Sequence, residues 1–396
     1  MKLVILDPDL TTFSGHNFNY VEGIAREARA RGIDTRIFAF RDIQPAVAKA
    51  VDAVGHFTTP GRAVLNDIPG DANVGVSWTH VVMNAVFLRD LVPLTGELGR
   101  DTLVFVPAAT SRQLFALAQW LALIAPPSLP SLVCLFRYDL DNYPNERELL
   151  KVPIKVLATL QRPAVLCCET AEIAETYVSS LDVPVTTIPF PFVVPFEPRA
   201  SDRVPGSATV GYFGDARYMK GSHLLPGLCE QAAASGDAYH LCIQTFLTGE
   251  EAAVPAQLAA VRRAALAAPE KVRLIEGPQP LARYHRLLLG CDIVLLPHNA
   301  TTYRRQTSAI FCEAVSAGKV IVMPEETSMS SAIRRMGGDP VTFSEWTVQG
   351  VQAALLRAVR ELDARRPEAM RLAGIWNKEN GAKALVERLV GWHHDV

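Results

Sequence analysis

The sequence predicts an α/β protein built from two Rossmann-like, doubly wound domains. Short apolar runs alternate with helical patterns through both halves of the 396-residue chain, as in βαβ units with parallel sheets. That length exceeds one ordinary core, because a domain commonly contains about 100–200 residues. A proline-rich stretch that begins at Pro189 separates the halves and cannot continue a helix or a strand. We therefore expect one domain in residues 1–200 and another in residues 201–377.

In the first half, buried apolar runs predict strands, and apolar positions three or four residues apart predict helices. The expected strands are 2–7, 35–40, 74–78, 102–106, 132–138, 164–169 and 185–188. The expected helices are 17–31, 111–124, 146–161 and 171–181.

The second half repeats the alternation of strands and helices. The expected strands are 209–213, 240–246, 272–276, 293–296 and 320–323. The expected helices are 222–234, 254–268, 281–289, 307–317, 329–336 and 348–362. A turn at 377–381 and a last helix at 385–392 complete the prediction.

Charge and cysteine content argue against several classes of protein. With 39 Lys and Arg against 41 Asp and Glu, the net charge of −2 predicts no overall attraction to nucleic acid or anionic lipid. The 7 cysteines include no Cys-x-x-Cys pair, which favours buried, reduced thiols over disulfides or a zinc site. The chain starts with a strand pattern in place of a secretory leader, and prolines interrupt its longest apolar tract, 114–136. We expect a cytoplasmic protein without a transmembrane segment, and peripheral contact with a membrane stays open.

The segment 277–324 carries the strongest functional pattern. A buried strand ends at Pro297, a polar loop follows, and Thr307 or Ser308 caps the next helix. The amides that begin this helix face the carboxyl end of a strand, where open parallel sheets bind ligands, and they attract a phosphate or sugar oxygen. Glu313 lies more than one turn further along the same helix. Its carboxylate is suited to accept hydrogen bonds from two hydroxyls of a ribose.

Two short motifs resemble the donor-binding signature of retaining GT-B glycosyltransferases, in particular those of the family 4 type. The first comprises Leu-Leu-Pro at 295–297 and Glu-Ala-Val-Ser-Ala-Gly-Lys at 313–319. The second is Val-Gly-Tyr-Phe-Gly-Asp-Ala-Arg-Tyr-Met-Lys-Gly at 210–221, with the Gly turn at Gly214. Two cations hold the donor diphosphate in that family, and the resemblance assigns this role to Arg217 and Lys220.

The resemblance implies two domains that face each other across a cleft, with a helix at about 378–396 packed back on the first domain. It implies transfer of a hexosyl or deoxyhexosyl group from a nucleoside-diphosphate sugar to an acceptor hydroxyl, with retention, in polysaccharide or glycoconjugate synthesis. A glycan or another hydroxyl compound is the expected acceptor, and no metal or cofactor is expected besides the donor. Arg217, Lys220 and the amides near Thr307 and Ser308 would stabilise the leaving phosphate, and Glu313 would position the ribose.

One position departs from the family pattern. The family usually has two glutamates with seven residues between them, and Arg305 occupies the first of the two positions when Glu313 is the second. A guanidinium has five donors and no acceptor, so it cannot accept a hydrogen bond from a sugar hydroxyl. Arg305 suits a phosphate oxygen or a carboxylated sugar instead.

The loop before the helix offers further candidates. Tyr303 and Arg304 either contact the donor or are simply exposed to solvent. His298 and Asn299 directly follow the strand, where they either line the ligand crevice or cap the loop.

In the first domain, Gly15 and His16 follow the first strand and resemble the first loop of GT-B enzymes. Gly15 gives room for close approach of a ligand, and His16 is suited to donate a proton or hydrogen bond to the leaving phosphate, with helix capping as the alternative. Asp139, close to Arg137, follows another strand and is a candidate proton acceptor for the incoming hydroxyl, with an ordinary charged loop as the alternative. We expect Thr170, after Glu169, to cap a helix.

Other functions on the same fold stay open. Epimerisation or hydrolysis of a nucleotide sugar needs the same donor site, and a non-catalytic sugar or nucleotide-binding protein would tolerate Arg305. An oxidoreductase has little support, because no Gly-x-Gly-x-x-Gly follows the first strand of either domain.

Overall fold

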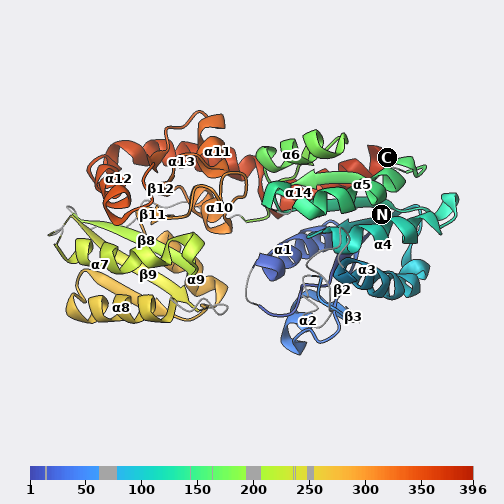
Figure 1. Cartoon of the computed structure of the whole chain (residues 1–396), viewed down its shortest axis with the longest axis horizontal. Coiled ribbons are helices and arrows are strands. Elements are labelled where there is room, and N and C mark those ends of the chain that lie inside the picture. Colours follow the sequence, from blue (N-terminus) through green and yellow to red (C-terminus); the bar gives the residue numbers. More distant parts are fainter. Residues whose placement is uncertain are drawn as a thin grey trace. The chain divides into compact units, whose positions relative to one another are not determined.

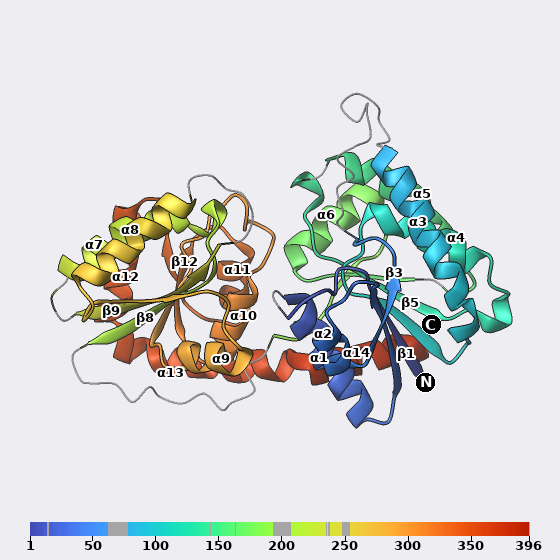
Figure 2. The same ribbon diagram turned by 90° about the horizontal axis from the view of Figure 1, so that it is seen from below.

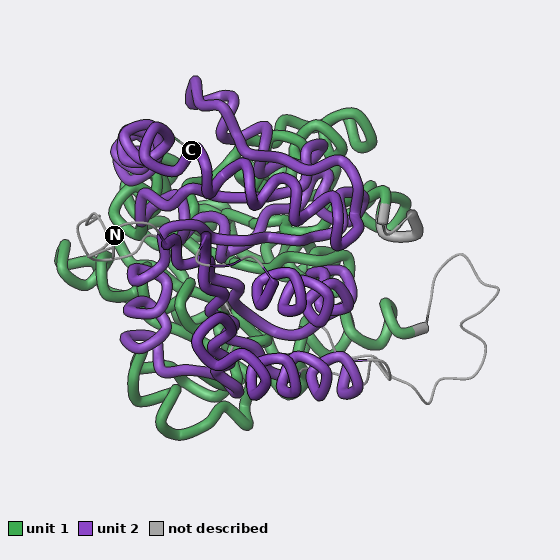
Figure 3. The backbone as a smooth tube through the Cα atoms, turned by 90° about the vertical axis from the view of Figure 1, so that its left-hand side faces the viewer, with its two compact units in different colours: residues 1–191, 380–396 green, residues 192–379 purple. Residues whose placement is uncertain are grey.

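The computed structural model describes the chain in two compact units (Figure 3). Unit 1 comprises Met1–Pro191 and Asn380–Val396, and unit 2 comprises Phe192–Glu379. The residues described are 1–396 except 14–15, 62–77, 143, 163, 193–206, 235, 237, 248–253 and 396, and except the side chains of 16, 78, 142 and 144–146. The units divide after Pro191 and Glu379, where the sequence analysis set the boundaries after residues 200 and 377.

Within the described residues, unit 1 contains a seven-stranded parallel sheet in the order β3-β2-β1-β4-β5-β6-β7. Its strands are β1 Lys2–Asp7, β2 Asp34–Phe40, β3 Ala53–Phe57, β4 Thr102–Val106, β5 Ser131–Phe136, β6 Val165–Cys168 and β7 Thr186–Thr187. Its helices are α1 His16–Ala30, α2 Pro45–Val51, α3 Trp78–Leu91, α4 Ser111–Ala122, α5 Pro144–Thr159, α6 Ala171–Leu181 and α14 Gly381–Asp395. Helices cover both faces of this sheet (Figure 1), which explains why β1, β4 and β5 are almost continuously apolar.

The last helix, α14, packs against α1 in unit 1. Gly381 N donates to Phe190 O at 2.6 Å, and Phe190 N donates to Asn380 Oδ1 at 2.8 Å. Further along, Ser131 Oγ and His393 Nδ1 lie 3.0 Å apart in a buried hydrogen bond. The end of the chain is therefore fixed to the first unit by buried polar contacts as well as by apolar packing.

In the described part of unit 2, a six-stranded parallel sheet has the order β10-β9-β8-β11-β12-β13. Its strands are β8 Ala208–Asp215, β9 Tyr239–Phe246, β10 Val272–Glu276, β11 Ile293–Leu295, β12 Val320–Pro324 and β13 Val341–Phe343. Its helices are α7 Leu225–Ala234, α8 Val254–Ala267, α9 Leu281–Leu289, α10 Ala309–Ser316, α11 Ser328–Arg335, α12 Val348–Arg360 and α13 Leu362–Glu379. On one face α7 contacts α8 and α12, and α10 contacts α13 in another layer (Figure 2).

Several elements escaped the sequence analysis. These are α2, β3, α3, β13 and α13. β3 is an edge strand in which Val54 is 45% exposed, and β13 has only 3 residues, so neither gives a strong buried pattern. Pro367 lies inside α13, at a position that normally argues against a helix. The expected strand 74–78 lies almost wholly outside the described residues. Among the residues that the structure describes, no helix is long and apolar enough to cross a membrane.

Candidate functional site

The candidate site of unit 2 lies where the strand order of the sheet reverses. β8 pairs with β9 on one side and with β11 on the other, although β9 and β10 intervene in the sequence. The loops after β8 and β11 therefore leave the carboxyl end of the sheet in opposite directions. In doubly wound sheets this is the position at which ligands bind.

Gly214, near the end of β8, marks the centre of the site. A methyl group on its Cα would lie 2.9 Å from Ile310 Cδ1 and 3.5 Å from Lys220 Nζ. Ile310 belongs to the first turn of α10. The Lys220 ammonium and the amino end of α10 thus border the same small space beside Gly214.

Asp215, which the sequence analysis did not single out, holds both predicted cations. Its Oδ2 lies 2.5 Å from Arg217 Nε, and its Oδ1 accepts a hydrogen bond from Lys220 Nζ. The Arg217 side chain is 49% exposed, whereas that of Lys220 is 12% exposed. Burial lowers the pKa of Lys220, and the Asp215 carboxylate partly offsets that effect. Two positive charges against one negative charge leave the group with a net positive charge.

The loop that carries Lys220 is locked to the loop after β11. Gly221 has φ = +77°, and a Cβ atom at this position would overlap Pro297 O. Asn299 N donates to Met219 O at 2.9 Å, and Trp346 Nε1 donates to Pro297 O at 2.8 Å. These contacts fix the position of the lysine relative to the second loop.

His298 is buried between the two predicted cations and α10. Its Nε2 lies 3.4 Å from Ser308 Oγ, and its ring centroid lies 4.3 Å from that of Tyr303. Burial, reinforced by the charges of Lys220 and Arg217, holds the pKa of His298 well below 6.5, so the imidazole is neutral at pH 7. Ser308 is the N-cap residue of α10, but its hydroxyl makes no capping hydrogen bond there. That hydroxyl faces His298 instead.

Glu313 is buried and is held by α9. Tyr284 Oη donates a hydrogen bond to Glu313 Oε2, and His285 Nε2 lies 3.9 Å from Oε1. Burial and the neighbouring carboxylate raise the pKa of Tyr284. Lys319, six residues further along the chain, donates to Leu289 O at 2.7 Å. A buried carboxylate needs a hydrogen-bond donor, and Tyr284 supplies it here. Tyr284 was not among the residues predicted from the sequence.

Gln244, on β9, joins two loops of the site. Its Oε1 accepts from Gly214 N at 3.3 Å, and its Nε2 donates to Gly277 O at 2.9 Å. Gln279 Nε2 also donates to Gly277 O, at 3.0 Å. The loop at Gly214 is therefore coupled to the loop at 277–280, which precedes α9. A Gln that directly follows the apolar run 241–243 of β9 was the available sequence signal.

Comparison with known proteins identifies the fold of the chain. No protein-family model and no curated protein matches the sequence. Solved structures do: HepE of Anabaena in complex with UDP and glucose matches with a TM-score of 0.69 and 14% identity over 100% of each chain. The UDP-forming α,α-trehalose-phosphate synthase of Burkholderia xenovorans matches with a TM-score of 0.68 and 14% identity, again over 100% of each chain. The chain has the GT-B fold.

A third similar structure is the N-terminal domain of the trehalose-6-phosphate phosphatase of Candida albicans. It has a TM-score of 0.69 and 11% identity, and the match covers 99% of this chain and 96% of that one. At such low identity these likenesses concern the fold. The roles assigned to individual residues from the sequence stay predictions.

The remaining predicted donor residues lie between the end of β11 and α10. Tyr303 is buried, Arg304 is exposed, and Arg305 and Thr307 are half-buried. Contacts with α11 hold this loop, because Ser328 Oγ donates to Gln306 O at 2.6 Å and Ser328 N donates to Tyr303 O at 3.3 Å. Because Tyr303 is only 8% exposed, it could contact a donor only through a small part of its surface.

Unit 1 contains the residues predicted for the acceptor side. Gly15 lies outside the described residues, as does the side chain of His16, the first residue of α1. Asp139 is buried and its Oδ1 accepts from Asp141 N at 3.1 Å, which is the geometry of a turn. A role for Asp139 as proton acceptor stays a prediction.

Arg137, Glu169 and Thr170, at the ends of two strands of unit 1, have structural partners. The buried side chains of Arg137 and Glu169 form an ion pair with Nε–Oε1 at 2.7 Å, and the Arg137 guanidinium lies 5.4 Å from the centre of the Tyr20 ring. Thr170 Oγ1 accepts from Ile173 N at 3.1 Å and caps α6, as expected from the sequence.

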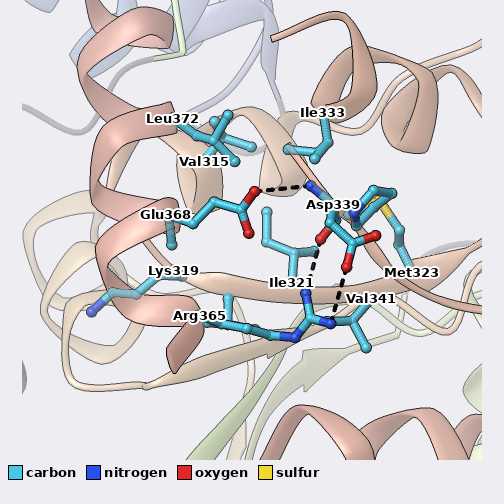
Figure 4. Close-up of a pocket in the computed structure, with 13 residues that line it drawn as sticks. Val315, Lys319, Ile321, Met323, Ile333, Asp339, Val341, Arg365, Glu368 and Leu372 are labelled. Carbon is cyan, nitrogen blue, oxygen red and sulfur yellow. Dashed lines mark hydrogen bonds and ion pairs between the residues drawn. The ribbon is translucent and has the colours of Figure 1, made fainter. Parts of the chain in front are cut away.

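A separate small hollow of unit 2 lies beside β12 and β13 (Figure 4). It is lined by residues of β12, of β13 and the segment before it, and of α10, α11 and α13, and its volume is about 40 Å³. Arg365 Nη1 donates to Asp339 O at 2.9 Å, and Asp339 N donates to Glu368 Oε1 at 3.0 Å. Small-molecule sites usually have volumes of about 300–1,000 Å³, so this hollow is far too small for a nucleotide sugar.

Proposed function

We propose that the protein is a glycosyltransferase that moves a sugar from a nucleoside-diphosphate donor to an acceptor hydroxyl. One observation carries the proposal: Lys220 and the amino end of α10 meet beside Gly214, with Arg217 joined to Lys220 through Asp215. An ammonium, a guanidinium and free helix amides together form a site for a diphosphate.

The chemistry follows from charge. As the bond between sugar and phosphate breaks, negative charge develops on the departing β-phosphate. Cations fixed near that oxygen stabilise the transition state more than the ground state. A bound diphosphate would replace Asp215 as the main partner of Lys220 and Arg217. Because Asp215 holds both side chains in place beforehand, little reorganisation would be needed when the donor arrives.

Similar structures support a UDP-sugar as the first donor to test. The HepE structures of Anabaena contain UDP, UDP and glucose, or UDP-glucose, and the Burkholderia synthase is described as UDP-forming. The starch synthase IV of Arabidopsis contains ADP, so adenine nucleotides belong in the same test. We further propose that transfer proceeds with retention and without a metal, and that it serves polysaccharide or glycoconjugate synthesis.

A second candidate is a protein that binds a nucleotide sugar without transferring it. Arg305 favours this alternative, because an acid at this position would be expected to contact the transferred sugar. A screen of acceptors with the wild-type protein and with Arg305→Glu separates the two. Transfer to any acceptor excludes a pure binding role, and release of free sugar without an acceptor would indicate hydrolysis.

The proposal is tested by a thermal-shift and calorimetry screen of UDP, ADP, GDP, dTDP and CMP sugars. A ligand at 100 times its Kd stabilises the folded protein by about 2.7 kcal/mol. Lys220→Ala should weaken binding about 10- to 100-fold, the value of a hydrogen bond to a charged group. Lys271→Ala is the matched control, because Lys271 precedes β10 at the other edge of the same sheet and donates to Gly236 O.

Two results would contradict the proposal. Absence of binding by every nucleotide sugar would exclude the donor site. Equal affinities for Lys220→Ala and Lys271→Ala would place the nucleotide elsewhere on the protein.

A further inference from the structure

The amino end of the sheet in unit 2 has a hollow that is separate from the candidate donor site. Its volume is about 360 Å³, within the range of about 300–1,000 Å³ that is usual for small-molecule sites. The hollow is lined by the first residues of β8 and β9, by β10 and the segment before it, and by the end of α9. The predicted donor residues follow the carboxyl ends of β8 and β11, so this hollow lies at the other end of the same sheet.

Two cysteines line the hollow and approach each other over a glycine. Cys242 on β9 is the direct partner of Gly211 on β8, so both positions face the same side of the sheet. A methyl group on Gly211 would lie 2.6 Å from Cys291 Sγ. Because Gly211 has no side chain, the Cys291 thiol has room to reach over β8 and form a hydrogen bond with the Cys242 thiol.

Arg273 flanks Cys242 on the other side. In the ladder between β9 and β10, Arg273 is the direct partner of Cys242, so its side chain starts from the same face. The hydrogen bond with Cys291 lowers the pKa of the Cys242 thiol, and the positive charge of Arg273 adds to this effect against the opposing effect of burial. Burial instead raises the pKa of four other thiols, those of Cys134, Cys167, Cys168 and Cys229. Cys242 is therefore the better nucleophile, because the thiolate is the reactive form.

The side chains around the hollow are mainly basic. Lys271, Arg273 and Arg286 line it together with one carboxylate, that of Glu270, so three cations against one anion leave a net charge of +2. Such a hollow attracts a small anion more than a neutral or cationic molecule. Cys242 is only 7% exposed, so a reagent reaches its thiol through the hollow.

We propose that Cys242 is a modification site that forms a mixed disulfide with a small, carboxylate-bearing disulfide bound in this hollow by Lys271, Arg273 and Arg286. The Cys242 thiolate attacks one sulfur of the bound disulfide, so that a new S–S bond forms and the S–S bond of the reagent breaks. The other half of the reagent leaves as a thiolate and takes a proton from solvent, which balances the proton that Cys242 lost. The Cys242 sulfur is oxidised and the departing sulfur is reduced. This site is independent of the proposed glycosyl transfer.

The spacing of the strands prevents Cys291 from displacing the modifying group. Cys242 lies on β9 and Cys291 lies just before β11, and these strands flank β8. Two strand spacings separate their backbones by about 9.5 Å. The Cα atoms of a disulfide are usually about 4.4–6.8 Å apart, so the two thiols can touch but cannot bridge unless the backbone moves. The mixed disulfide at Cys242 should therefore persist.

The test treats the folded protein at low ionic strength with three disulfides of similar size. These are dithiodipropionate, which is anionic, hydroxyethyl disulfide, which is neutral, and cystamine, which is cationic. Each rate is divided by the rate of the same reagent with mercaptoethanol, and mass spectrometry of peptides identifies the modified cysteine. We expect modification at Cys242, with a normalised rate about 10-fold higher for the anionic than for the neutral reagent and lowest for cystamine. Added salt should reduce this preference.

Two variants and a control connect the reaction to the hollow. Arg273→Gln should lower the preference for the anionic reagent at least about threefold. Arg262→Gln is the matched control and should leave the preference unchanged, because Arg262 forms an ion pair with Glu276 outside the hollow. Cys242→Ser should abolish the modification. If this variant does not fold, peptide mapping of the wild type decides the site by itself.

Several results would overturn the inference. One is modification of another cysteine before Cys242. Another is the loss of two hydrogens from the chain without addition of the reagent, which would show a disulfide between Cys242 and Cys291. Equal normalised rates for the anionic and cationic reagents, or an equal preference in Arg273→Gln and Arg262→Gln, would show that the basic side chains do not select the reagent.

Discussion

Replacing Gly221 by alanine tests whether the contact between the Lys220 loop and Pro297 builds the candidate site. Gly221 has φ = +77°, and the added methyl group would overlap Pro297 O. The backbone cannot relieve this overlap cheaply, because the Pro297 carbonyl is also bonded to Trp346 Nε1 at 2.8 Å. We expect Gly221→Ala to destabilise unit 2 and to displace Lys220.

The magnitude has two parts. A non-glycine residue in the left-handed region costs about 1–2 kcal/mol. Overpacking against a fixed group adds about 1–3 kcal/mol. Gly337→Ala separates these parts, because Gly337 has φ = +73° and an added methyl group would meet nothing within 4 Å. Gly337→Ala should therefore show only the first cost.

Thermal unfolding followed by circular dichroism measures both variants under the same conditions. For a folding unit of about 150–250 residues, such as unit 2, each kcal/mol shifts Tm by roughly 2–4 °C, so Gly221→Ala should unfold at least about 2 °C below Gly337→Ala. Calorimetry with the best nucleotide ligand should show weaker binding for Gly221→Ala alone. Equal Tm values and equal affinities for the two variants would refute the argument that this loop contact positions Lys220.

Two further predictions concern stability. Burial lowers the pKa values of His298 and His393 below the usual 6.5, so both imidazoles bind a proton less readily in the folded protein than after unfolding. Their contribution to stability is full above about pH 6.5 and falls as the pH drops below it, by up to about 1.4 kcal/mol per pH unit for each group. The drop in Tm between pH 7.5 and pH 5.5 should therefore shrink in His298→Gln and in His393→Gln. An unchanged drop in Tm would contradict the lowered pKa of the substituted histidine. Asp292 has a side chain only 2% exposed, bonded to Arg366 and to Thr209 N at 2.9 Å, so Asp292→Ala should cost about 3–5 kcal/mol in urea unfolding. Asp339, whose side chain is 77% exposed and pairs with Arg365, is the control, since Asp339→Ala should cost less than about 1 kcal/mol. Similar costs at both positions would show that burial does not decide the difference.

The sequence predicted most of the central strands correctly because they are buried on both faces. β1, β4, β11 and β12 are short, largely apolar runs, and such runs identify strands of a covered parallel sheet. Edge strand β3 and helix α13 were missed because their local patterns are weak, and the surrounding packing stabilises them.

The chain itself determined the order of its elements, the two-part organisation and the residues at the carboxyl ends of β8 and β11. Those properties depend on short-range patterns of apolar, Gly and Pro residues, which are visible in a linear sequence. Tertiary structure decided the partners: Asp215 between two cations, Tyr284 against Glu313, and Gln244 between two loops. A buried polar group must find a donor or acceptor wherever the fold provides one, and that partner can be distant in sequence, as Tyr284 is from Glu313.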